Sequence, residues 1–250
     1  MADAFTNHFG AVSRQYAASR PTYPASLYEW LASQAPDRAL AWDCGAGSGQ
    51  ASVALAAHFE QVLATDASAE QLAQAPAHPG VTWRIAPAQD SGLDEHVVSL
   101  VTVAQALHWF PLDAFYTEVR RVLKPRGVVA AWTYAAFVLA NREADDIVRA
   151  YHYGTVDQYW PPERMQVEHG YRDMPFPFTR LEAPAFHMRT SWTLEQVTSY
   201  LRSWSATARY VAAHGRDPVV DVEQQLRAVW GDPQQAVDIG WPLTVIAGHV

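Results

Sequence analysis

The chain of 250 residues is 49% hydrophobic and 18% charged, which excludes an intrinsically disordered segment and suits one large α/β domain with room for an inserted cap. Lys and Arg number 18 against 26 Asp and Glu, and the net charge of −8 argues against a nucleic-acid partner, because such partners need a basic surface. A single cysteine, Cys44, excludes an internal disulfide, and the sequence shows neither a leader nor a membrane-length apolar run, so we expect a soluble cytoplasmic protein.

The first 35 residues are amphipathic and rich in aromatic side chains. The prolines of Arg20-Pro21-Thr22-Tyr23-Pro24 impose an extended elbow on this segment. Behind the elbow, apolar residues at helical spacing predict a helix over Ala25–Gln34. The simplest interpretation is an N-terminal helix that packs on the rest of the fold.

From Leu40 to about Trp132, predicted strands and helices alternate, which is typical of a parallel, doubly wound sheet. The clearest helix is Leu112–Leu123, whose apolar residues fall on one face. We predict five strands, at Ala39–Asp43, Gln61–Asp66, Val81–Ile85, Val97–Val103 and Val128–Trp132.

The first predicted strand opens into a glycine turn, Asp43-Cys44-Gly45-Ala46-Gly47-Ser48-Gly49. Glycines between a strand and a helix let a ligand approach the bare backbone. Asp43 would repel a pyrophosphate and attract a ligand that carries an ammonium group. Asp66 ends the second predicted strand, where a nucleoside site places its ribose-binding carboxylate. The turn therefore favours a nucleoside ligand with a positively charged group.

Beyond the fifth predicted strand the chain is crowded with aromatic residues and prolines and is too apolar to be a linker. Thr193 and Gln196 form a capping-box pair at the start of a helix whose apolar side recurs as far as Ala208. A further helix covers about Val219–Trp230. We interpret Ala135–Asp232 as a cap that supplies an acceptor pocket. Two more strands complete the sheet, at about Thr179–Met188 and Val237–Gly248.

Several motifs resemble a known family. Residues 104–110 have the sequence Ala-Gln-Ala-Leu-His-Trp-Phe, residues 123–127 are Leu-Lys-Pro-Arg-Gly, and residues 203–206 are Ser-Trp-Ser-Ala. With the Asp-x-Gly-x-Gly-x-Gly turn and the Arg-Pro-x-Tyr-Pro elbow, they resemble the class I S-adenosylmethionine-dependent methyltransferases. Within these, the chain is most similar to the methyltransferase type 11 branch that includes the trans-aconitate methyltransferases.

The resemblance covers most of the chain and implies its architecture. The expected fold is α/β, a doubly wound, mostly parallel seven-stranded sheet of the Rossmann-like methyltransferase kind with a helical cap. It divides a single methyltransferase domain, 1–250, into lid helices (1–35), a cofactor-binding core (36–134), a cap with the acceptor pocket and sixth strand (135–232) and a last strand (233–250). Residues 1–24 are expected to form a lid that the cofactor orders.

The resemblance also implies a cofactor, S-adenosylmethionine, and the residues that bind it. Asp43 is expected to hold its amino-acid end, directly or through water, and Asp66 its ribose hydroxyls. The backbone of Ala88 and the side chain of Gln89 are expected at the adenine edge, although Pro87 stands where many relatives have an acid. The full expected cofactor set is Asp43, Gly45, Ala46, Gly47, Asp66, Ala67, Ala88, Gln89, Gln105, Arg20 and Tyr16.

The expected reaction is methyl transfer to a small-molecule acceptor, with a carboxylate or hydroxyl oxygen as the candidate reacting atom. His108 is the candidate catalytic base, and packing beside Trp109 is the alternative role for it. A base is needed only for a hydroxyl or an amine, since a carboxylate is already ionised at neutral pH. The expected acceptor-binding residues are His108, Trp109, Tyr23 and Trp160.

Two other functions remain open from the sequence. A nicotinamide dinucleotide-dependent oxidoreductase is one, although Gly-x-Gly-x-x-Gly needs glycine at position 50, which is Gln. A non-catalytic nucleoside-binding protein on the same fold is the other. Neither Cys/His metal spacing nor a Gly-x-Ser-x-Gly elbow occurs in the sequence, so we expect no metal and no acyl-enzyme chemistry. The oligomeric state is left open.

Overall fold

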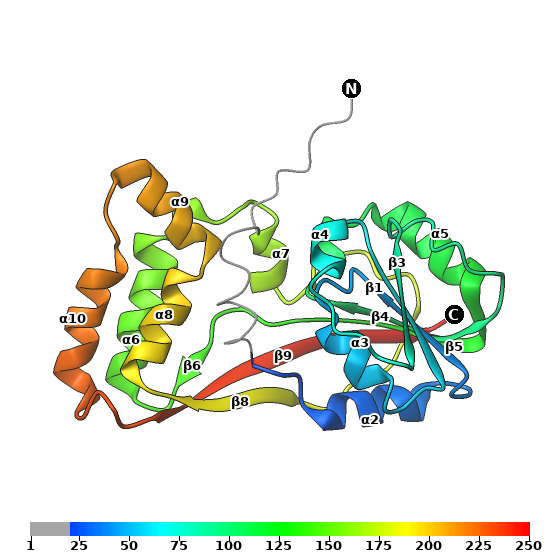
Figure 1. Ribbon diagram of the computed structural model, residues 1–250, viewed down its shortest axis with the longest axis horizontal. Helices are drawn as coiled ribbons and strands as arrows, with labels where there is room; N and C mark the ends of the chain where they lie inside the picture. The colour runs from blue at the N-terminus through cyan, green and yellow to red at the C-terminus, as the bar shows by residue number, and fades with distance from the viewer. Residues whose placement is uncertain (1–20) are drawn as a thin grey trace. The chain divides into compact units, whose positions relative to one another are not determined.

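The structure, a computed structural model, describes residues 21–250 (Figure 1). These residues form two compact units. We call Thr22–Ala135, Glu163–His187 and Pro242–Val250 the sheet unit, and Ala136–Pro162 with Met188–Trp241 the helical unit. Glu163–His187, which the sequence placed in the cap, therefore belongs to the sheet unit.

The sheet unit is built on five parallel strands in the order β3-β2-β1-β4-β5, followed by the antiparallel β9 (Val237–His249). The parallel strands are β1 (Leu40–Cys44), β2 (Gln61–Asp66), β3 (Val81–Ile85), β4 (Val98–Ala104) and β5 (Leu123–Thr133). From β1 the chain adds β2 and β3 on one side, and it then crosses to the other side of β1 to add β4 and β5. The loops that follow the neighbouring strands β1 and β4 therefore lead away from each other. In open α/β sheets, ligands bind at this switch point.

Helices cover both faces of the sheet because strand side chains alternate between them. Phe115 and Val119 of α5 (Leu112–Val122) pack into one core cluster with Val101 and Val129. On the opposite face, the Trp132 ring contacts Tyr28 of α2 (Ala25–Gln34) at 6.3 Å between centroids. Figure 1 shows α2 and α3 (Gln50–Leu55) on one side of the strands and α5 on the other. Two apolar layers thus fix the loops at the carboxyl edge.

Short elements complete the sheet unit. They are α4 (Ala69–Leu72), the 3-10 turn η1 (Leu107–Trp109), α7 (Arg164–Glu168) and β7 (Thr179–Arg180). β7 pairs antiparallel with β9.

The helical unit contains a group of helices around aromatic side chains, in which α10 packs against both α6 and α8 (Figure 1). Its helices are α6 (Arg142–Ala150), the π-helical turn η2 (Tyr151–Thr155), the 3-10 turn η3 (Asp157–Tyr159), α8 (Leu194–Arg202), α9 (Ser205–His214) and α10 (Val219–Trp230). Its strands are β6 (Val138–Leu139), most of β8 (Phe186–Trp192) and the start of β9. At the centre, Phe137 lies 5.6 Å from the Tyr200 ring and 5.6 Å from the Trp241 ring.

The α/β, doubly wound fold predicted from the sequence is confirmed, and α2 and α10 begin and end at the predicted residues. The sheet has nine strands in the described residues rather than seven. The predicted sixth strand is split into β7 and β8 by a segment that contains Pro184, which has no backbone N–H to donate. The two-residue β6 adds the ninth strand.

The helix predicted to run from Thr193 through Ala208 was wrong in its length. It stops at Arg202, where the Ser203 hydroxyl donates to the Tyr200 carbonyl at 2.6 Å. Trp204 then takes an extended conformation, with φ −69° and ψ 137°, and α9 starts at Ser205. The capping box at Thr193 and Gln196 is present as predicted.

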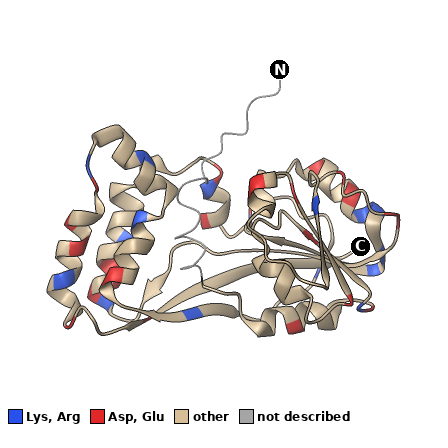
Figure 2. Ribbon diagram, viewed as in Figure 1, with Lys and Arg blue, Asp and Glu red and all other residues tan. Residues whose placement is uncertain are grey.

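Charged residues of both signs are interspersed over the helices of each unit in the view of Figure 2. The described residues therefore present no continuous basic stripe in that view, in keeping with the net charge of −8. Within residues 21–250, no helix is long and apolar enough to cross a membrane, and no group of three or more His, Cys, Asp or Glu side chains is placed to bind a metal ion.

Candidate active site at the carboxyl edge of the sheet

The glycine turn after β1 is the first component of the site. Gly45, Gly47 and Gly49 have φ values of +71°, +57° and +85°, in the left-handed region that side chains disfavour. The backbone amides of Gly45 and Ala46 donate to the Thr65 carbonyl at 2.8 and 2.9 Å. These bonds join the turn to the end of β2, so its position is set by the sheet.

The three glycines differ in the space that an added side chain would have. A Cβ on Gly45 would lie 2.7 Å from the Ala106 Cβ, and one on Gly49 would lie 2.2 Å from the Trp83 ring, so both sites are closed by packing. Among residues 21–250, a Cβ on Gly47 would meet only a Gln71 side-chain oxygen at 3.9 Å. Gly47 therefore presents backbone that no other described side chain covers, and a ligand can approach it there.

Asp66 lies beside this open backbone. Its Oδ2 accepts a hydrogen bond from the Gly47 amide at 2.8 Å, and its Oδ1 accepts one from the Ser68 amide at 2.8 Å. Asp66 is only partly buried. Since each carboxylate oxygen accepts more than one hydrogen bond, both oxygens keep capacity for hydroxyl groups of a ligand.

Asp43 has a different environment from the one expected for a direct ligand contact. It is fully buried, and its two oxygens accept hydrogen bonds from the hydroxyls of Ser52, at 2.5 Å, and Thr102, at 2.8 Å. Burial, together with the nearby negative charge of Asp66, raises the pKa of Asp43 to about 6, although the two hydroxyls oppose this shift. Asp43 thus lies beneath the glycine turn as a buried acid that a positive ligand would help to ionise.

Two buried donors make no hydrogen bond with the described residues. They are the hydroxyl of Tyr28, on which the charge of Asp43 acts, and the indole Nε1 of Trp132, whose ring contacts Tyr28. Burial, and secondarily the charge of Asp43, raises the pKa of Tyr28, so its hydroxyl stays protonated.

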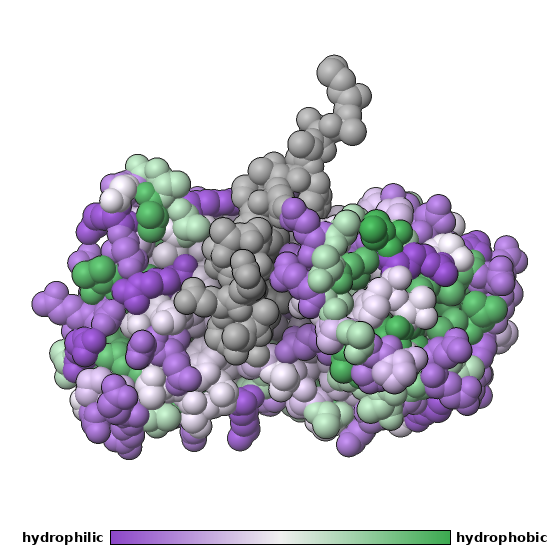
Figure 3. Space-filling view, viewed as in Figure 1, coloured by the Kyte–Doolittle hydropathy of each residue, from purple (hydrophilic) through white to green (hydrophobic). Residues whose placement is uncertain are grey.

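The loop after β3 forms the next part of the edge. The Ala86 amide donates to the Asp66 carbonyl at 3.1 Å, which brings this loop beside the end of β2. Ala88 is buried and Gln89 is exposed. The side chain of Ile85 is 64% exposed at the end of β3, a large exposed fraction for a strand isoleucine. Figure 3 shows apolar surface of the sheet unit in the region between α4 and α5.

The loop after β4 closes the edge. Gln105 has a φ of +57°, a strained value for a residue that is not glycine. Its Nε2 donates to the Tyr134 carbonyl at 3.0 Å, and its Oε1 accepts from the Thr133 hydroxyl at 2.5 Å. The side chain of Gln105, predicted as a cofactor contact, therefore links the ends of β4 and β5.

His108 lies on η1, in the same loop. Its Nδ1 is 3.1 Å from the Tyr171 hydroxyl, and its ring is 4.7 Å from the ring of Trp109, which is 48% exposed. Burial, and to a smaller extent the charge of Arg164, lowers the pKa of His108 to about 4. The imidazole is therefore neutral at physiological pH.

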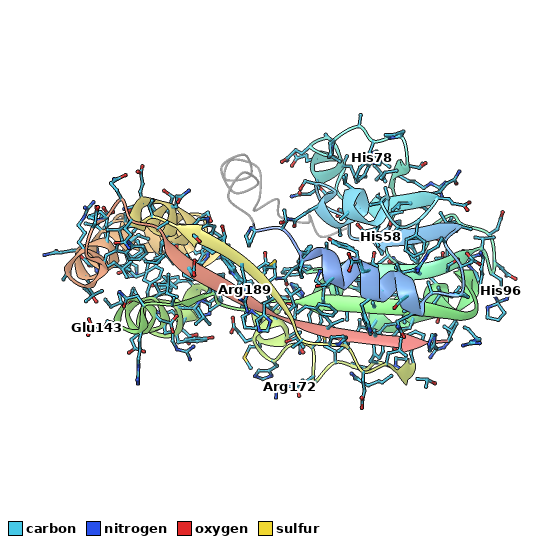
Figure 4. All side chains as sticks on the ribbon, turned by 90° about the horizontal axis from the view of Figure 1, so that it is seen from below. His58, His78, His96, Glu143, Arg172 and Arg189 are labelled. Carbon is cyan, nitrogen blue, oxygen red and sulfur yellow. The ribbon has the colours of Figure 1, made fainter. Side chains whose placement is uncertain are left out.

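Other histidines of the sheet unit are engaged elsewhere. His78 and His96 lie at the outer parts of this unit in Figure 4, and the His58 ring stacks on Tyr28 of α2 with 6.4 Å between centroids. His78 accepts a hydrogen bond from the Gly80 amide at 3.1 Å, and His96 contacts the Leu123 carbonyl at 2.9 Å. His108 is thus the histidine that follows β4 at the carboxyl edge.

The structure brings most of the predicted site residues to one edge of the sheet unit. The residues placed there are Asp43, Gly45, Ala46, Gly47, Asp66, Ala67, Ala88, Gln89, Gln105, His108 and Trp109. Tyr23 is buried against Trp132, with ring centroids 5.5 Å apart, and Trp160 belongs to the helical unit. Tyr16 and Arg20 lie outside the described residues, as do residues 1–20 of the lid predicted over residues 1–24.

Three residues of this region were missed from the sequence. Tyr171 contacts His108, Thr133 contacts Gln105, and Phe110 packs on Gly45, with 3.0 Å between its ring and a Cβ placed there. Gly170-Tyr171 follows α7 as a glycine-tyrosine turn, which gives no hint of a contact 63 residues earlier in the chain.

Comparisons of this chain with known families and sequences agree with one another. A family model described as a methyltransferase domain matches residues 42–131. Over 249 residues the chain is 33% identical to a candidate methyltransferase of Dictyostelium discoideum, covering 97% of this chain and 94% of that protein. The chain belongs to the methyltransferase family. It is also 36% identical over 120 residues to an uncharacterized methyltransferase of Mycobacterium tuberculosis, about half of each chain, at 48% and 49%.

Solved structures agree with this assignment. The methyltransferase is 44% identical to a candidate type II methyltransferase of Anaeromyxobacter dehalogenans, with a TM-score of 0.88 over 92% of this chain and 97% of that one. A candidate antibiotic-pathway methyltransferase of Anabaena variabilis shares the fold at 18% identity and a TM-score of 0.55 over 93% of this chain and 99% of that one. The protein is an enzyme with a Rossmann-like methyltransferase fold, and the oxidoreductase alternative receives no support.

Proposed function

We propose that the enzyme transfers a methyl group from S-adenosylmethionine to a small-molecule acceptor. The observation that carries this proposal is the paired arrangement of the open Gly47 backbone with the Asp66 carboxylate, above the buried Asp43. A carboxylate with spare acceptor capacity suits two ribose hydroxyls. A buried acid suits a ligand that carries both a sulfonium and an ammonium.

The remaining proposed cofactor contacts lie at the same carboxyl edge of the sheet. The loop at Ala88 and Gln89 is positioned for the adenine edge, and the exposed side chain of Ile85 offers an apolar surface for the face of the ring. Ala67 and Gln105 flank the ribose and methionine portions in this scheme. When bound, the cofactor supplies an activated methyl group, and the protein's contribution is to align the acceptor and exclude water.

The acceptor side of the site is formed by His108 and the exposed ring of Trp109. We propose an oxygen acceptor, a hydroxyl or a carboxylate, in keeping with the resemblance of residues 104–110 to the branch that includes trans-aconitate methyltransferases. Tyr23, Trp160, Tyr16 and Arg20 remain predictions for the acceptor pocket and the cofactor carboxylate.

Isothermal titration with S-adenosylhomocysteine and with NAD tests the proposal. We expect binding of the first and none of the second. Asp66→Ala should weaken S-adenosylhomocysteine binding by ~1.5–3 kcal/mol, the range for hydrogen bonds to a charged group. Asp94→Ala, which removes an exposed acid outside the site, is the matched control and should leave affinity unchanged. Equal affinity in Asp66→Ala and the wild type would refute the ribose assignment.

A further inference from the structure

We propose that Glu118 of α5 is a positioning residue that makes the enzyme select a 6-aminopurine nucleoside over a 6-oxopurine one. It acts through Ser91, which holds the turn at residues 87–90 in place against the purine base. This inference rests on the proposed cofactor and deepens that proposal, because it assigns the residue on which recognition of the base depends.

Glu118 is a buried acid that the proposed methyl transfer does not use. Among residues 21–250, Glu118 and Asp43 are the only buried acids. Burial opposes the ionisation of Glu118, but hydrogen bonds from Arg121 and Ser91 outweigh this effect and lower its pKa. Apolar side chains in place of a buried ion pair often leave a fold equally stable or more so. Stability alone therefore does not account for this ion pair, and its contacts indicate another role.

The contacts of Glu118 join α5 to the loop after β3. Its Oε1 accepts hydrogen bonds from the Ser91 amide, at 2.9 Å, and from the Ser91 hydroxyl, at 2.5 Å. Arg121 binds the same carboxylate twice, since its Nη2 donates to Oε1 at 2.7 Å and its Nε donates to Oε2 at 2.8 Å. The Arg121 Nη2 also donates to the Leu93 carbonyl at 2.7 Å. The ion pair thus fixes the loop at Ser91 and at Leu93.

A second side chain, Arg84 of β3, holds the same loop. Its Nη1 donates to the carbonyls of Ser91, at 2.8 Å, and Gly92, at 3.1 Å. The Ser91 hydroxyl oxygen accepts a hydrogen bond from the Leu93 amide at 3.2 Å. The amide, carbonyl and hydroxyl groups of Ser91 are therefore all hydrogen-bonded, and the residue is fully buried. Ser91 is a fixed point of the loop.

The turn itself lies between two fixed points of the chain. Its first residue, Pro87, follows the backbone hydrogen bond to the end of β2, and its last residue, Asp90, precedes Ser91. The Asp90 amide donates to the Pro87 carbonyl at 3.2 Å, which leaves Ala88 and Gln89 as the central residues. Their backbone amides donate to no acceptor among residues 21–250. These two amides are therefore available to a ligand, and the bonds on either side of the turn determine where they lie.

A backbone amide discriminates between purines because it only donates. Atom N1 of a 6-aminopurine is an acceptor, whereas N1 of a 6-oxopurine carries a hydrogen and donates. An Ala88 amide held opposite N1 therefore pairs with the first base and faces a second donor in the other. The side chain of Gln89 does not discriminate, since its amide group can turn to present either the oxygen or the nitrogen. Selectivity thus depends on how firmly the turn is held, and Glu118 holds it.

Isothermal titration of the wild type with S-adenosylhomocysteine and with S-inosylhomocysteine measures this selectivity. The two ligands differ only at N1 and C6 of the base, so the ratio of their affinities cancels the contributions of the ribose and of the amino-acid end. We expect the adenine ligand to bind at least about tenfold more tightly, because a donor that faces a donor loses its hydrogen bond. Equal affinities for the two ligands would overturn the proposal.

Glu118→Gln is the principal variant. It keeps the shape of the side chain but replaces one acceptor oxygen by a donor nitrogen, so the donors of Arg121 and Ser91 can no longer all be satisfied. We expect S-adenosylhomocysteine to bind about tenfold more weakly, S-inosylhomocysteine to bind almost as before, and the ratio to fall by about the same factor. A variant whose fold is merely weakened would lose affinity for both ligands alike and keep the ratio.

Glu223→Gln is the matched control, because Glu223 on α10 also accepts from two arginines, Arg227 at 2.7 Å and Arg202 at 3.1 Å. It should leave both affinities unchanged. Ser91→Ala is the second variant, in case Glu118→Gln prevents folding. It removes one of the two hydrogen bonds from Ser91 to the carboxylate and should lower the ratio by a smaller factor. A ratio that stays at the wild-type value in every one of these two variants that folds would overturn the proposal.

Hydrogen exchange of the ligand-free enzyme tests the role of Glu118 without the cofactor. The amides of residues 91–93 should exchange faster in Glu118→Gln and Ser91→Ala than in the wild type and Glu223→Gln. Unchanged exchange at these residues in Glu118→Gln would show that Glu118 does not hold the loop, and the proposal would be withdrawn. Failure of the wild type to bind S-adenosylhomocysteine would instead count against the proposed function, since the exchange is measured without any ligand.

Discussion

At the scale of a single residue, the burial of Asp43 determines the pH at which its carboxyl group ionises. It carries a raised pKa of about 6, and the cause is chiefly its complete burial. In the absence of ligand, ionisation of this buried carboxyl group near neutral pH lowers the stability of the folded enzyme. A cationic ligand offsets that loss, so ligand binding and ionisation of Asp43 are thermodynamically linked.

A pH prediction follows from the sign of this shift. The folded pKa of Asp43 is above its ordinary value of 3.8, so its stabilising contribution is full below that value and is lost as pH rises through about 6. Ligand-free Asp43→Asn should therefore be more stable than the wild type above pH 6, by an amount on the order of 3 kcal/mol for a shift of two units.

As pH rises, the affinity for S-adenosylhomocysteine should change in the opposite direction to the stability of the ligand-free enzyme. For the wild type, S-adenosylhomocysteine affinity should fall by up to about tenfold for each pH unit below 6, since the neutral acid no longer attracts the ligand's ammonium. Titration calorimetry and urea unfolding across this range measure both effects, with Asp94→Asn as the exposed control. A wild-type affinity that does not change with pH would show that Asp43 does not sense the ligand's charge.

The sequence predicted where much of the candidate site lies in the fold, and the reason is locality. Asp43, the three glycines and Asp66 belong to strand ends and turns whose positions follow from their immediate neighbours. Tyr171 could not be predicted, because its contact with His108 joins residues 63 positions apart. Thr133 was likewise not predicted, because the fifth predicted strand ends one residue earlier and the bond of Thr133 to Gln105 depends on which strands are neighbours in the sheet.

At the scale of secondary structure, local signals set most helix ends, and tertiary packing set the rest. The break between α8 and α9 falls in a segment whose apolar spacing continues as a helix. Trp204 leaves that helix and contacts the rings of Phe137, at 6.2 Å, and Tyr151, at 5.9 Å. Periodicity does not encode these long-range contacts. The capping box at Thr193 is local, and it was predicted.

Removal of that capping box should weaken α8 measurably. The Thr193 hydroxyl accepts from the Gln196 amide at 3.4 Å, and the Gln196 side chain accepts from the Thr193 amide at 2.9 Å. Thr193→Ala leaves helix amides unsatisfied and should lower the free energy of unfolding by ~0.5–2 kcal/mol. Urea unfolding is the measurement, and Thr193→Ser should stay close to the wild type. A loss equal in the serine and alanine variants would argue that the methyl group, rather than the cap, is what matters.

At the scale of the whole molecule, the elements that position the candidate site all belong to the sheet unit. The glycine turn follows β1, Asp66 ends β2, Ala88 follows β3, and His108 follows β4. Tyr171, which contacts His108, belongs to the same unit although it lies far along the chain. The described residues that we propose for the cofactor therefore all lie in the part of the chain that builds the sheet.

Hydrogen exchange can test this assignment to the sheet unit. Saturation with S-adenosylhomocysteine at about 100 times its Kd should stabilise the fold by ~2.7 kcal/mol. Local protection should concentrate at residues 45–49, 66–68 and 105–109, whose amides or side chains line the proposed cofactor contacts. Helices α6, α8 and α10, which pack on one another, should show little local change. The matched experiment with NAD should show no protection at any of these segments. Strong protection of α6 with S-adenosylhomocysteine alone would mean that the helical unit contributes directly to the cofactor site, and the assignment of that site to the sheet unit would have to be withdrawn.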